Sequence, residues 1–148
     1  MNLPLHVLVL HFAVVLIPMG ATATIAVMAR PQWRTRFAPY VAAGNIALLA
    51  LAFVTVRAGI ALQHHLDPTG ENVPTHDHEA YGKALLWTVF ALAVVSTVTW
   101  FASRAPRFGP AALTGLAGVV ALLAFASAGM TVITGHTGSE SHWGAIYK

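Results

Sequence analysis

The eight histidines are the residues of this sequence best suited to chemistry. Neutral imidazole ligates zinc, copper, nickel and haem iron, and its protonation changes near neutral pH. Two pairs, at positions 64–65 and 76–78, have the close spacing typical of metal ligands and flank a single polar stretch. The full set is His6, His11, His64, His65, His76, His78, His136 and His142.

Four apolar segments must position these histidines, at about residues 5–28, 39–63, 79–102 and 109–134. A helix of about 24 residues spans roughly 36 Å, enough to cross a hydrocarbon core of about 30 Å. Backbone amides in lipid must be paired within the segment, and the segments lack the alternation of strands, so we expect helices. The prediction is one all-α domain over residues 1–148, an integral membrane up-and-down four-helix bundle.

The composition supports a membrane protein. The chain is 57% hydrophobic and only 9% charged, whereas a soluble domain carries roughly 25% charged residues. It has no cysteine, which excludes thiolate metal sites, iron–sulfur clusters and covalent haem attachment. The basic residues are mostly arginines in two short loops, a pattern that orients a membrane protein and argues against nucleic-acid binding.

The arginines also predict an orientation. Arg30, Arg34 and Arg36 follow the first apolar segment, and Arg104 and Arg107 follow the third. The positive-inside rule therefore places these two loops in the cytoplasm, and the N- and C-termini with the second loop outside. Every histidine and every acidic residue then falls at or near the outer face of the bilayer. This segregation of histidine is the most informative feature of the sequence.

We expect some of these histidines to hold haem b or a divalent transition metal. The predicted haem-binding residues are His11, His78 and His136, with Arg57 pairing with a propionate or another anion. The predicted metal ligands are His6, His11, His64, His78 and His136. His11 ranks first, because a polar ring inside an apolar helix needs a partner. Two other interpretations stay open, namely a proton-responsive patch and interfacial histidines with no ligand.

Three motifs resemble a family of bacterial membrane proteins known as domain of unknown function 2231. They are LPLHVLVLHFAVVLIPMG at the start, HDHEAYGKALLW at the opening of the third helix and TGHTGSESHW near the end. The family's recurring histidines correspond to His6, His11, His78 and His136. Some relatives are fused to Rieske-type iron–sulfur domains, so the resemblance implies electron transfer with a b-haem or quinone partner, in the bacterial inner membrane.

The predicted function is a small redox or metal-binding membrane protein that acts as an electron-transfer or accessory component. No nucleophile–base pair, phosphate-binding loop or zinc-protease motif is present, so nothing argues for hydrolysis or group transfer. The alternative is a structural or assembly subunit of a larger membrane complex, without a cofactor. Expected partners are the lipid bilayer, a redox protein or larger complex, and further copies of the chain.

Overall fold

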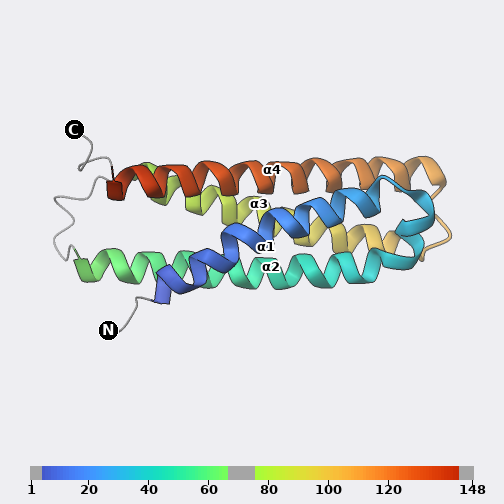
Figure 1. Ribbon diagram of the computed structural model, residues 1–148. Helices are drawn as coiled ribbons and strands as arrows, with labels where there is room; N and C mark the ends of the chain where they lie inside the picture. Colours follow the sequence, from blue (N-terminus) through green and yellow to red (C-terminus); the bar gives the residue numbers. More distant parts are fainter. Residues whose placement is uncertain (1–4, 67–75, 144–148) are drawn as a thin grey trace.

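Four antiparallel helices make up the part of the chain that the structure, a computed structural model, describes. This part comprises residues 5–66 and 76–143, with side chains for residues 6–65 and 77–140. The helices are α1 (Leu5–Met28), α2 (Pro31–Leu66), α3 (His76–Ala102) and α4 (Pro110–Trp143). They form one elongated bundle (Figure 1), without a strand among the described residues. The predicted all-α four-helix bundle is confirmed, and each helix is long and apolar enough to span a membrane.

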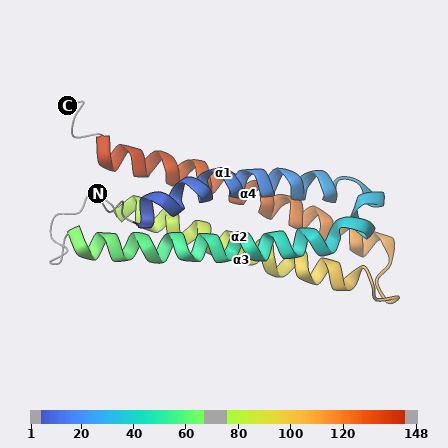
Figure 2. The same ribbon diagram turned by 60° about the horizontal axis from the view of Figure 1, so that its bottom comes forward.

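The helices are arranged as a square in cross-section. Helix α1 packs against α2 and α4, and α3 packs against the same two helices. A hydrogen bond from Arg34 Nη1 of α2 to Thr114 Oγ1 of α4, at 3.3 Å, also joins one diagonal pair. The two ends of the bundle differ in which helices begin there and which are joined there (Figures 1 and 2). We call the end where α1 and α3 begin the histidine end, and the end where α1 joins α2 and α3 joins α4 the arginine end.

The distribution of polar and apolar side chains is the reverse of that in a soluble bundle. Large apolar side chains such as Trp87, Leu122 and Phe125 are about 70% exposed, at 69%, 71% and 71%. Asn45 and Ser127 are at most 1% exposed in the interior. Exposed apolar side chains suit contact with lipid, where apolar surface costs nothing, so this pattern fits a bundle whose solvent is the bilayer.

Three helices are longer than the predicted apolar segments, and the smallest difference is in α3, which begins three residues early at His76. Helix α2 begins at Pro31, eight residues earlier than expected, so Arg34 and Arg36 lie in its first turns and not in a loop. Proline suits the first helical position because its missing N–H would have no partner there. The Arg34 side chain donates from Nε to the Met28 carbonyl oxygen at 2.7 Å, which caps the end of α1.

The described part of α4 also continues nine residues beyond Thr134, to Trp143. The predicted helix ended where the apolar residues end, but a helix can continue into the aqueous boundary because its backbone hydrogen bonds are internal. His136 and Glu140 are therefore helical residues.

Candidate functional site

Two histidines at the histidine end lie between helices. His6, in the first turn of α1, is half-buried against α2, where its Nδ1 lies 3.1 Å from the Thr55 carbonyl oxygen. One turn further along α2, Gly59 lies under the imidazole ring, because a Cβ built on it would be 3.0 Å from His6 Cε1. A carbonyl and a glycine four residues apart thus form the surface that receives His6.

His78 has the same surroundings in the other half of the chain. Its ring lies between α3 and α4 and is half-buried, with Nδ1 3.0 Å from the Thr134 carbonyl oxygen. A Cβ built on Gly138 would be 2.8 Å from His78 Cε1. The Thr134 carbonyl and Gly138 are again four residues apart on one face of a helix.

The two hairpins therefore present equivalent sites. Both threonines are buried, and their hydroxyls are already engaged within their own helix: Thr55 Oγ1 donates to the Leu51 carbonyl at 2.8 Å, and Thr134 Oγ1 to the Met130 carbonyl at 2.7 Å. In both sites the backbone carbonyl is the group that meets the imidazole. In these contacts α3 corresponds to α1, and α4 corresponds to α2.

These contacts determine which nitrogen carries the proton in each neutral ring. A carbonyl oxygen can only accept, so Nδ1 of His6 and of His78 must be the donor. Nε2 is then left with a lone pair. With Nδ1–H on a backbone carbonyl, Nε2 is the nitrogen able to ligate a metal, which is the usual arrangement of a ligating imidazole.

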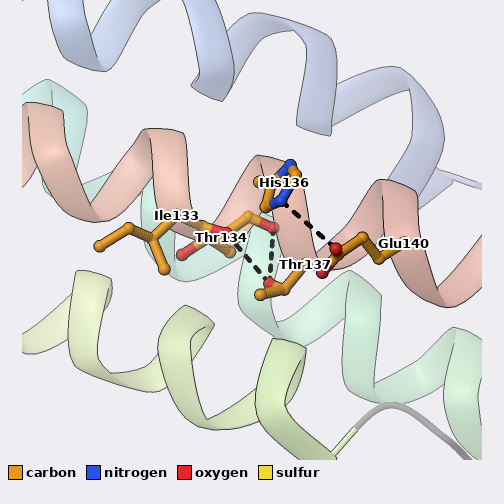
Figure 3. A network of polar contacts seen from close by, with 5 residues as sticks. All are labelled: Ile133, Thr134, His136, Thr137 and Glu140. Atoms are coloured by element: carbon orange, nitrogen blue, oxygen red, sulfur yellow. Dashed lines mark hydrogen bonds and ion pairs between the residues drawn. The ribbon is translucent and has the colours of Figure 1, made fainter.

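Two other predicted ligands lie outside this pair. His11 is exposed, and its Nδ1 bonds to the Val7 carbonyl of its own helix at 2.6 Å. His136 is also exposed, with Nε2 3.4 Å from Glu140 Oε1 one turn along α4. Figure 3 shows the His136 side chain extending along α4 toward Glu140. In the same view, Thr137 bonds to carbonyl oxygens of α4 itself. Neither ring is directed at a neighbouring helix by these contacts.

The remaining candidates are dispersed. His64, His65 and Arg57 are exposed on α2, and Arg57 lies two residues from Thr55, on the opposite side of the helix from the carbonyl that meets His6. The side chains of His76 and His142 lie outside the described part of the chain. Within that part, no three His, Asp or Glu side chains are grouped so that they could hold a metal ion.

A polar cluster also crosses the middle of the bundle. Thr24 of α1 donates from Oγ1 to Asn45 Oδ1 at 3.3 Å, and Asn45 Nδ2 donates to Ser96 Oγ at 3.2 Å. All three side chains are buried. Asn45 of α2 thus forms hydrogen bonds to both α1 and α3, as polar side chains between membrane helices commonly do.

Sequence reasoning missed the surfaces that receive the two histidines. Both surfaces have the spacing Thr-x-x-x-Gly, at Thr55–Gly59 of α2 and at Thr134–Gly138 of α4. The same spacing also occurs at Thr114–Gly118 and Thr131–Gly135 of α4, so the spacing alone does not identify the two surfaces. The repeat is visible in the sequence, but its meaning depends on knowing which helix faces each motif.

Comparison with known proteins gives a family and no closer match. No curated protein and no solved structure matches the chain. The family model described as "Predicted membrane protein (DUF2231)" matches residues 2–145, which is nearly the whole sequence. The match includes both histidines of the equivalent sites and all four helices, so this chain belongs to the DUF2231 family of predicted membrane proteins.

Proposed function

We propose that the chain is a small redox membrane protein in which His6 and His78 hold haem b at the histidine end. The observation that carries this proposal is the pair of equivalent imidazoles. Each has Nδ1 bonded to a carbonyl of the adjacent helix and an available Nε2. Those carbonyls fix the ring orientation and increase the basicity of the nitrogen that would bind.

Two imidazoles suit haem better than a bare divalent ion. A structural zinc site needs four protein ligands and a catalytic one needs three, and no group of three ligands is formed within the described residues. Haem iron is already held by its macrocycle and takes only axial ligands from the protein. A divalent transition metal remains the second candidate, with further ligands from water or a partner.

In this function the protein supplies position and environment. Haem would supply a one-electron couple, and the chain's own residues would orient the axial nitrogens and limit the access of water. A site at the bundle end lies near the membrane boundary, so a redox partner could approach it there. The proposed location is the bacterial inner membrane with the histidine end outside, as the arginines at the opposite end favour.

An absorption spectrum of the detergent-purified protein from haem-replete cells tests the proposal. We expect a Soret band and, on reduction, split α and β peaks. His6→Gln or His78→Gln should abolish or strongly shift them, because glutamine can still donate to the carbonyl but is a poor axial ligand. His11→Gln and His136→Gln are matched controls and should leave the spectrum unchanged.

Three results would count against this assignment. Loss of the pigment in His11→Gln with an unchanged spectrum in His6→Gln would move the ligands to other histidines. A colourless protein with one bound metal by elemental analysis would replace haem by a metal. A colourless, metal-free preparation would favour the alternative of a structural or assembly subunit.

A further inference from the structure

A groove with wholly apolar walls lies between α2 and α3. Its volume is about 600 Å³, within the range of roughly 300–1,000 Å³ typical of small-molecule sites. Exposed aromatic rings form part of it, with Trp87 and Phe90 meeting edge to face at 5.7 Å between centroids. Because no polar side chain lines it, the part of an occupant inside it must be hydrocarbon. The walls include Ile46, Ala50 and Phe53 of α2 and Leu86, Trp87 and Phe90 of α3.

Beyond the groove, toward the histidine end, each of the two helices carries one basic residue. Arg57 follows Phe53 by four residues, and Lys83 precedes Trp87 by four. Residues four apart lie on the same face of a helix, so each cation lies on the stripe that forms the groove wall. Both basic side chains are exposed.

The two cations also lie at nearly the same height. The hydrogen bond from Asn45 Nδ2 to Ser96 Oγ gives the register between the antiparallel helices α2 and α3. Arg57 is twelve residues from Asn45, and Lys83 is thirteen residues from Ser96, in the same direction along the bundle. At 1.5 Å per residue these are roughly 18 and 20 Å. Beyond the groove, each of the two helices therefore carries one basic residue at nearly the same height.

We propose that this groove binds an anionic phospholipid, with an acyl chain along the apolar walls and the phosphate at Arg57 and Lys83. The guanidinium group of arginine can bind a phosphate through two parallel N–H donors. Arg57 has no ion pair with another described residue, whereas Lys83 is paired with Glu79. Arg57 is thus the main phosphate contact, and Lys83, whose charge Glu79 offsets, adds an N–H donor beside it.

The charge is what favours a lipid over a second copy of the chain. A helix–helix interface in a membrane is rich in small residues that allow close approach, whereas this groove is lined by large aromatic and aliphatic side chains. Two copies meeting here would also bring their Arg57 side chains into the same interface. A phospholipid supplies both the hydrocarbon and the compensating negative charge.

Native mass spectrometry of the detergent-purified full chain tests this proposal. The probes are dioleoyl phosphatidylglycerol and dioleoyl phosphatidylcholine, added separately and in competition. We expect the anionic lipid to bind at least about fivefold more tightly, since each basic residue near a lipid surface contributes roughly 1 kcal/mol. Arg57→Gln should remove most of this preference, and Lys83→Gln should reduce it less.

Matched variants separate the two parts of the site. Ala50→Phe fills the groove and should weaken both lipids, whereas Ala126→Phe, at an exposed position of α4, should weaken neither. Arg104→Gln at the arginine end is the charge control and should leave the preference intact. Glycerophosphoglycerol, which has the headgroup without acyl chains, should not compete, because the apolar walls supply much of the affinity.

Two results would overturn the proposal. One is equal binding of the two lipids, or a preference that survives Arg57→Gln. The other is a dimer that binds no lipid and dissociates in Ala50→Phe, which would assign the groove to a second copy of the chain. Because the haem test uses absorption at His6 and His78, either proposal can fail without the other.

Discussion

At the scale of single residues, the histidine end depends on Gly59 and Gly138 as well as on the two imidazoles, because each glycine lies against one ring. A glycine in a helix costs about 1 kcal/mol relative to alanine, so its presence there requires a reason. The reason here is space, since a Cβ at either position would meet the ring of His6 or His78 at 3.0 Å or less. Each glycine lets an imidazole reach the carbonyl one turn before it.

Replacing these glycines by alanine should therefore be harmful. In Gly138→Ala the new methyl group would displace His78, and overpacking of this kind costs about 1–3 kcal/mol. That cost exceeds the gain of about 1 kcal/mol in helix propensity. We expect a lower unfolding free energy in detergent, with a smaller loss in Gly59→Ala, because the contact with His6 is looser.

Gly44→Ala and Gly129→Ala are the controls for that experiment, because nothing lies within 4 Å of a Cβ at either position. Both should be neutral or stabilised by up to about 1 kcal/mol. If all four variants gained stability alike, the close approach of the rings would not be a constraint on the fold.

The identity of the paired histidines could not be predicted from the sequence. In a soluble helix, the apolar stripe shows which side faces the core. In this protein both the lipid side and the interior side of each helix are apolar, so periodicity does not distinguish them. The sequence therefore ranks His11 above His6, although His6 meets α2 and the bond of His11 is to the Val7 carbonyl of its own helix. The gathering of histidine toward one end is predictable, because position along a helix sets its height.

At the scale of helices, apolar composition predicts four helices but not where α2 begins or how far α4 continues. The apolar run marks only what can lie in lipid. The additional turns at the start of α2 depend on a local feature, Pro31 at the first helical position. The additional turns at the end of α4 matter for the site, because Gly138, which receives His78, lies in the extension of α4 beyond Thr134.

The polar cluster in the middle of the bundle should stabilise helix packing. Asn45 links α1 and α3 through Thr24 and Ser96, and all three are buried. Removing the amide in Asn45→Ala leaves two polar partners in the interior. Interhelical hydrogen bonds in membranes average about 0.6 kcal/mol with a maximum near 1.7, so we expect a loss of about 1 kcal/mol in an unfolding titration.

Two threonines of α1 provide an internal comparison for this cluster. Thr24→Ala should lose part of the same stability, since its hydroxyl donates to Asn45. Thr22→Ala should lose almost none, because Thr22 is exposed and bonds only to the Pro18 carbonyl of its own turn. Equal effects of the two alanine variants would show that the interhelical bond contributes nothing measurable.

At the scale of the whole molecule, the two hairpins face the same way along the bundle. Each contributes one imidazole, one carbonyl acceptor and one glycine to the histidine end. Each also contributes arginines to the opposite end, where α1 joins α2 and α3 joins α4 (Figure 1). Because both hairpins place their arginines at the same end of the bundle, the two sets of arginines favour the same orientation in the membrane.

That orientation can be measured directly, since the chain has no cysteine of its own. Ser139→Cys places one thiol at the histidine end, and Gln32→Cys places one at the arginine end, both at exposed positions. In intact spheroplasts, a membrane-impermeant maleimide should label the first and not the second, and both should react after detergent is added. The reverse pattern would put the histidine end in the cytoplasm. In that case the five arginines at the other end would not set the topology, and a haem held by His6 and His78 would exchange electrons with cytoplasmic partners.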